Sequence, residues 1–218
     1  MDVQRIQRFA MRENFYRFFG DLYSKRPDLN ILQEAVSLPV RYDLPDDAKW
    51  RKYTSYAAQL RKNNTTGFEK HLPKLIIFYD TVMGDNLLEL YEYGFYTRKN
   101  DYACATGELE EFFVDYPYRK RNGLDTGHIA LQLYYLADLS AISQEQAYSG
   151  NIAAVKEGIM VQQMFYKRFT AVWWPFFAYE IGRIAEKYDF YRETAALFKC
   201  FMADDTQFMQ YTISGSDC

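Results

Sequence analysis

The expected fold is decided by DTGHIALQLYYLADL, residues 125–139. After Asp125 this stretch carries no formally charged side chain until Asp138. A segment that is apolar on nearly every side is typical of a helix buried in the middle of a core. The stretch also opens with a polar Asp-Thr-Gly-His turn, which indicates a candidate site at the helix N-terminus, around Asp125 and His128.

Helical periodicity continues through most of the chain. Residues 3–23 have apolar side chains at spacings of three and four, with Arg and Glu between them, which predicts an amphipathic helix. Proline, glycine and asparagine place loops or turns at 39–45, 63–67 and 116–126. We find no internal repeat and no Gly/Ser linker. Helices are predicted at about 3–23, 28–36, 46–62, 68–83, 84–99, 106–114, 125–142, 151–172, 175–188 and 190–203.

This pattern predicts an all-α protein. We expect a single compact, bundle-like domain of about ten helices over residues 1–213, followed by a frayed tail at 214–218. Hydrophobic residues make up 49% of the 218 positions and charged residues 25%, which is ordinary for a globular domain. The chain is unusually aromatic, with 20 Tyr, 17 Phe and 3 Trp, and Tyr suits both wet cores and peptide-binding surfaces.

Charge and cysteine usage narrow the class of protein. A formal net charge of −3 argues against a nucleic-acid binder, because phosphate neutralisation needs a dominant basic face. The N-terminal residues are charged throughout, and the longest uncharged runs, 126–137 and 169–179, are shorter than the ~20 residues that a membrane span needs. The three cysteines form no paired framework. We therefore expect a cytoplasmic protein with no stable membrane insertion.

Catalytic and cofactor motifs are missing from the sequence. There is no GxSxG nucleophile turn and no glycine-rich phosphate loop. With only two histidines, and a single approximate Glu-x-x-His pattern at 125–128, neither a di-iron nor a zinc site is expected. The sequence therefore predicts no cofactor, no metal ion and no catalytic residue.

An acidic cluster surrounds two phenylalanines in the helix predicted at 106–114. It admits two interpretations: a solvated face over a buried Phe pair, or an acidic, aromatic groove for an apolar peptide that contains arginine. Arg can pair with carboxylates and stack on aromatic rings at once. His128 likewise admits a structural role or a recognition role. The cluster consists of Glu108, Glu110, Glu111 and Asp115 around Phe112 and Phe113.

Four segments in order along residues 5–205 together resemble the TorD-like family of maturation chaperones for molybdenum redox enzymes. RENFYRFFGDLYSKRPD (12–28) resembles the opening helix of that family. LEEFFV (109–114) resembles its aromatic-x-x-Leu-Phe helix, and residues 125–139 resemble its Glu-Pro-x-Asp-His turn and apolar helix. The stretch 165–202 resembles its Trp-x-Pro-x-Phe pattern and final helix.

The resemblance implies an all-helical, non-enzymatic protein that binds the twin-arginine leader of a partner enzyme subunit until the cofactor is inserted. By position, His128 matches the signature histidine and Tyr16 an aromatic of the opening helix. The signature Asp is replaced by Gly127. The implied leader site is lined or supported by Tyr16, Leu109, Phe112, Phe113 and His128, with carboxylates from Asp125, Glu110, Glu111 or Asp115.

The leading hypothesis is thus a chaperone whose partner is the catalytic subunit of a molybdenum oxidoreductase, bound through its leader or in its apo form. The groove would be formed by the 109–128 region and the first helix. One alternative is a permanent helical interaction subunit of a redox complex. Another is a small-molecule enzyme that uses His128 and Asp125 as an acid–base pair. A homodimer is compatible with the sequence.

Overall fold

The computed structural model describes residues 3–42, 44, 48–62, 64–84, 99–116 and 123–214. These residues form nine α-helices and two π-helical turns, and they include no strand. The prediction of one all-α helical domain is confirmed. The helices are α1 (Val3–Ser24), α2 (Leu29–Arg41), α3 (Ala48–Lys62), α4 (Asn64–Phe78), α5 (Lys99–Asp115), α6 (Ile129–Tyr148), α7 (Ile152–Phe165), α8 (Trp174–Ile184) and α9 (Asp189–Ser214), and the π-helical turns are η1 (Tyr79–Gly84) and η3 (Tyr166–Thr170).

Some predictions fall on residues that the structure does not describe. Most of the helix predicted at 84–99 lies outside the described residues, as do the residues predicted to start the third helix, Asp46 and Asp47. The tail beyond Ser214 also lies outside them. The prediction of a frayed tail therefore stays a prediction.

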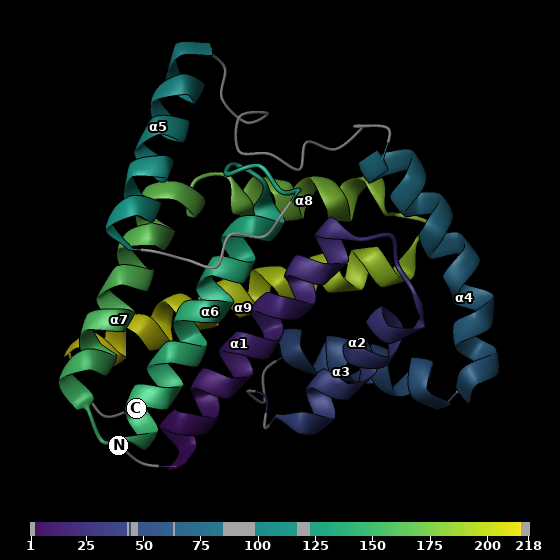
Figure 1. Ribbon diagram of the computed structural model, residues 1–218. Coiled ribbons are helices and arrows are strands. Elements are labelled where there is room, and N and C mark those ends of the chain that lie inside the picture. The colour runs from purple at the N-terminus through teal and green to yellow at the C-terminus, as the bar shows by residue number, and fades with distance from the viewer. Residues whose placement is uncertain are drawn as a thin grey trace.

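Helix α6 lies in the middle of the molecule, with α1 beside it and α9 behind (Figure 1). Residues 129–137 are all buried, as the apolar stretch predicts. Helices α1 and α6 are antiparallel: Arg17 pairs with Asp138 at 2.9 Å, and further along α1 and earlier in α6 the Ser24 and Tyr134 hydroxyls are 3.0 Å apart. Aromatic side chains of α1, α8 and α9 fill the space behind this pair, such as Phe19 on Phe198 and Tyr23 on Phe177.

Gly20 allows α1 and α6 to approach closely. A Cβ atom at this position would lie 2.7 Å from the ring of Tyr134, which is buried. Such a distance is shorter than van der Waals contact, so a side chain would push the two helices apart. By contrast, a Cβ on Gly182 in α8 would meet nothing within 4 Å.

Substitution of Gly20 with alanine is expected to lower the free energy of unfolding by about 1–2 kcal/mol, because overpacking costs more than the gain in helix propensity. The matched change Gly182→Ala should raise it by about 0.5–1 kcal/mol. Urea denaturation of the three proteins measures both effects. If both alanine variants gained stability equally, the close approach of α1 and α6 at Gly20 would be disproved.

Pro39 lies inside α2, where the sequence predicts a loop. Proline has no N–H, so the carbonyl of Ala35 one turn earlier loses its helical hydrogen bond. The hydroxyl of Tyr53 in α3 donates a hydrogen bond of 2.8 Å to that carbonyl. Helix α2 therefore continues through the proline because a neighbouring helix satisfies the acceptor.

A buried ion pair joins α1 to α9. Arg12 is 0% exposed, and its Nε and Nη2 donate to the two carboxylate oxygens of Asp205, the second at 3.1 Å. The Tyr16 hydroxyl donates to the same carboxylate at 2.7 Å. Burial and the adjacent Asp205 carboxylate raise the pKa of Tyr16, so its hydroxyl stays a donor. The guanidinium also lies over the ring of Phe208, 5.2 Å from its centroid.

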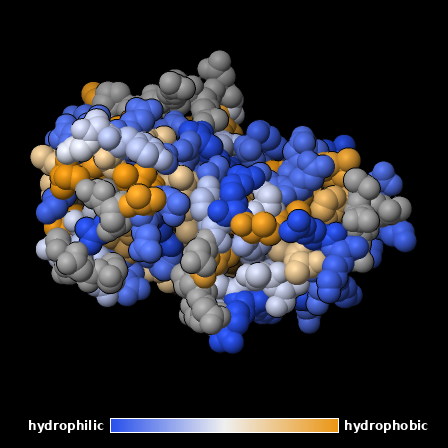
Figure 2. All heavy atoms as spheres, turned by 90° about the horizontal axis from the view of Figure 1, so that it is seen from below, coloured by the Kyte–Doolittle hydropathy of each residue, from blue (hydrophilic) through white to orange (hydrophobic). Residues whose placement is uncertain are grey.

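Hydrophobic side chains on the face seen from below form small groups between hydrophilic ones (Figure 2). The larger of these groups lie on the left, the side on which Figure 1 places α7. None of the helices in the described part of the chain is both long and apolar enough to cross a membrane.

Candidate functional site

A groove of about 530 Å³ runs between α5 and the end of α7 with η3. Figure 1 shows these helices next to each other on the left of the molecule. We call it the α5 groove. It is lined by Glu108, Glu111, Phe112, Asp115 and Tyr116 from the α5 side and by Met164, Lys167 and Arg168 from the α7 side.

The spacing of the α5 residues explains why they share one face. Residues three, four and seven apart on a helix lie above one another, so Glu108, Glu111 and Asp115 form a single row. At 1.5 Å per residue the row is ~10 Å long. Phe112 and Tyr116 lie next to it, with ring centroids 4.8 Å apart. The helix therefore offers a row of carboxylates beside an aromatic surface.

The ring of Phe112 forms the aromatic floor of the α5 groove, and packing against α6 and α7 fixes its position. Phe112 packs on Phe165 and Phe169, with centroids 5.6 and 5.4 Å away. Phe113 packs edge-on against Tyr135 of α6 at 4.9 Å. Because these rings contact one another on several sides, the groove is held in shape before anything binds.

The acidic side chains of the groove differ in whether they already form an ion pair within the protein. Glu108 accepts two hydrogen bonds from Arg168, at 3.0 and 3.1 Å. Glu111 and Asp115 are exposed, and neither forms an ion pair within the described part of the chain. Two carboxylates of the row are thus available to a ligand, and the third is held by the protein's own arginine.

The turn before α6 satisfies its own polar groups. Asp125 Oδ1 accepts the N–H of Gly127, and Asp125 O accepts the N–H of His128, each at 3.0 Å. His128 is the N-cap of α6, and its Nδ1 accepts the N–H of Ala130 at 3.0 Å. Burial lowers the pKa of His128 to about 4, against the raising effect of the Asp125 carboxylate, so the imidazole is neutral at pH 7.

The candidate residues from the sequence fall into separate places. Glu111, Phe112 and Asp115 line the α5 groove, and Leu109 and Phe113 are buried behind it. Glu110 is exposed on α5 but does not line the groove. The remaining candidates do not line it either: Asp125 and His128 build the turn before α6, and Tyr16 belongs to the buried pair of α1 and α9.

The sequence did not indicate that α7 forms the second wall of the groove. The expected second wall is α1, but the structure supplies Met164, Lys167 and Arg168 instead. The sequence carries one signal near this wall, the methionines Met160 and Met164 four residues apart, and the structure leaves them 46% and 45% exposed. Exposed methionines are typical of adaptable binding surfaces.

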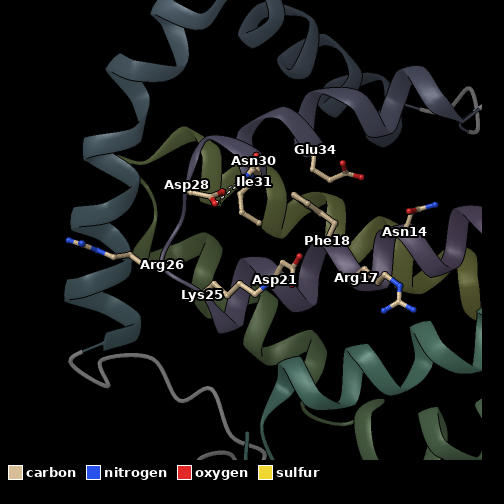
Figure 3. A pocket seen from close by; sticks show the side chains of 10 residues that line it. All are labelled: Asn14, Arg17, Phe18, Asp21, Lys25, Arg26, Asp28, Asn30, Ile31 and Glu34. Atoms are coloured by element: carbon tan, nitrogen blue, oxygen red, sulfur yellow. Dashed lines mark hydrogen bonds and ion pairs between the residues drawn. The ribbon is translucent and has the colours of Figure 1, made fainter. Parts of the chain in front are cut away.

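A second hollow, of about 350 Å³, lies between α1 and α2 (Figure 3). Most of its charged side chains already have partners. Lys25 pairs with Asp21 at 2.7 Å, and Arg26 pairs with Asp80 at 2.6 Å. Asp28 caps α2 by accepting the N–H of Ile31. The charged side chains that line this hollow are therefore largely engaged within the protein, by ion pairs and a helix cap.

No group of three His, Cys, Asp or Glu side chains that could hold a metal ion occurs among the described residues. No protein-family model, no curated protein and no solved structure matches the chain. The resemblance to the TorD-like family is therefore still a prediction.

Proposed function

We propose that the protein is a non-enzymatic chaperone that holds an arginine-containing, apolar peptide segment of a client protein in the α5 groove. The observation that carries this proposal is the row of Glu108, Glu111 and Asp115 beside a fixed aromatic floor. A guanidinium can bond a carboxylate and lie on an aromatic ring at once, so an arginine is the side chain that this arrangement suits best.

The α7 side of the groove suits an apolar residue next to that arginine in the client peptide. Met164 is 45% exposed and lines the same groove as Phe112. Methionine adapts its shape to different apolar partners, which suits a chaperone that binds an extended or helical segment transiently. Phe112 itself is 6% exposed, so it contributes a surface and does not enter a ligand pocket of its own.

The client class comes from the family resemblance. TorD-like chaperones hold molybdenum oxidoreductase subunits, and this chain resembles them in four ordered segments. We therefore propose a catalytic subunit of a molybdopterin-dependent oxidoreductase as the client, recognised through its leader or an assembly segment, with the chaperone acting in the cytoplasm. Because Gly127 stands where that family has an acidic residue, the carboxylates of α5 are the proposed source of charge.

Isothermal titration with a synthetic peptide tests this proposal. The peptide carries two adjacent arginines followed by a run of Phe and Leu. We expect saturable binding, and we expect about tenfold weaker binding when both arginines are replaced by norleucine, since each exposed ion pair contributes up to about 1 kcal/mol. Replacing Phe and Leu with serine should abolish binding. Equal affinity for the arginine and norleucine peptides would contradict the proposal.

One observation favours a second function, that of a permanent interaction subunit. Phe176 and Tyr179 of α8 are 61% and 56% exposed, and their spacing of three places them on one face of the helix. Val172, in the turn before α8, is 69% exposed. Exposed apolar faces of this kind mark interaction surfaces. Purification of the client complex separates the two functions: a subunit stays with the mature enzyme, and a chaperone leaves it.

A further inference from the structure

Arg168 occupies the α5 groove in the way that we expect of a client arginine. Its Nε and Nη2 atoms both donate to Glu108 Oε2, at 3.1 and 3.0 Å. Its guanidinium carbon lies 5.2 Å from the centroid of the Phe169 ring. Phe169 packs on Phe112, the floor of the groove. One side chain thus combines a carboxylate partner and an aromatic partner within the groove.

This inference rests on the proposed function. We propose that Arg168 is an internal competitor: it holds Glu108 in the empty groove, and a client arginine displaces it to engage the full row of carboxylates. Arg168 would then set specificity. A segment with a single basic residue finds Glu111 or Asp115 without disturbing the pair, whereas only a segment with several arginines gains from opening it.

The exposed position of the Arg168–Glu108 pair means that exchanging its arginine for a client arginine costs little free energy. The Arg168 and Glu108 side chains are 50% and 44% exposed, so both are hydrated and their mutual attraction is weak. The pair joins residues 60 positions apart, on α5 and on η3, so opening it leaves the backbone hydrogen bonds of both elements in place. The released guanidinium remains over Phe169 or moves into water.

Lys167 provides a matched control. It is the adjacent residue, it is exposed and it lines the same groove, but it forms no ion pair within the described part of the chain. Removing either cation changes the charge of the groove by the same amount. Only Arg168→Gln also removes the bonds that Arg168 donates to Glu108, so a difference between the two variants isolates the competition from the general electrostatic effect.

The test is isothermal titration of a peptide with three adjacent arginines followed by the same run of Phe and Leu, so that its arginines outnumber the two available carboxylates. It is titrated into the wild-type protein, Arg168→Gln and Lys167→Gln, and into each of these two variants in a Glu108→Gln background. Circular dichroism checks that each exposed-site variant folds. We expect Arg168→Gln to bind about two- to fivefold more tightly than Lys167→Gln. In the Glu108→Gln background this advantage should disappear.

Equal affinities of Arg168→Gln and Lys167→Gln would overturn the competition while leaving the peptide site in place. An advantage of Arg168→Gln that persists without Glu108 would overturn it as well. Failure of every variant to bind the peptide would instead overturn the proposed function, and the role of Arg168 with it. Binding by Arg168→Gln alone would support both.

Discussion

Replacing Asp205 with alanine is expected to lower the free energy of unfolding by about 3–5 kcal/mol, the largest effect of any single change that we predict. Arg12 is fully buried and Asp205 is 1% exposed. Without the carboxylate, a charged guanidinium remains in the core, with Phe208 and Phe9 as its neighbours. The Tyr16 hydroxyl would also lose its acceptor. Chemical denaturation at pH 7 measures the loss.

Asp204 supplies the matched control, one residue earlier in α9. It pairs with Arg8, and these side chains are 26% and 17% exposed. Because water reaches both groups, we expect Asp204→Ala to cost at most about 1 kcal/mol. Similar costs for the two substitutions would contradict the buried position of the Arg12–Asp205 pair.

The stability of the protein is expected to fall between about pH 6.5 and pH 4 because of His128. Burial lowers the pKa of its imidazole from 6.5 to about 4, so the unfolded chain binds a proton in this interval and the folded chain does not. The stability that a neutral His128 provides is therefore complete above pH 6.5 and is lost as the pH falls towards 4. The shift corresponds to a loss of about 3 kcal/mol.

The variant His128→Asn isolates this effect. Asparagine is a good N-cap, so its side-chain oxygen can accept the Ala130 N–H, but it does not titrate. Urea denaturation of both proteins from pH 7.5 to pH 4 gives two curves of stability. We expect the wild type to lose about 3 kcal/mol more than the variant over this range. Parallel curves would show that His128 is not buried in its neutral form.

The helical fold could be predicted because most helices bury one regular apolar face. The stretch 129–137 is the clearest case, and α1 and α2 begin where the sequence places them. The sequence predicts that the last helix ends near 203, just before Asp204 and Asp205. In the structure α9 continues to Ser214, because these two acids pair with Arg8 and Arg12 of α1.

Two further differences concern residues whose local sequence predicts a turn or a loop. Asn64 to Gly67 has the composition of a turn, but the backbone of these residues is the first turn of α4. Tyr53 lies 18 residues from Ala35, so its hydrogen bond, which accompanies the continuation of α2 through Pro39, is a tertiary contact. At both places the helix forms against the local turn signal, since propensity is a weak prior.

Only one of the two walls of the α5 groove could be predicted from the sequence. Its acidic and aromatic residues lie in one short stretch, and their helical spacing already placed Glu111, Phe112 and Asp115 together. Its other wall comes from Met164 and Arg168, some fifty residues later, and only the packing of α7 against α5 brings them there. The role of His128 could be stated only as two alternatives. The bond from Ala130 matches the structural alternative.

The central claim is that arginines of a client peptide meet the carboxylates of α5, and a double-mutant cycle tests it most directly. Titrations combine wild type or Glu111→Gln/Asp115→Asn with the arginine or norleucine peptide, and Glu110→Gln, an exposed change outside the groove, is the control. We predict a coupling free energy of about 1 kcal/mol or more for the groove variant and none for the control. Purely additive effects of the groove variant and the norleucine peptide would contradict the claim.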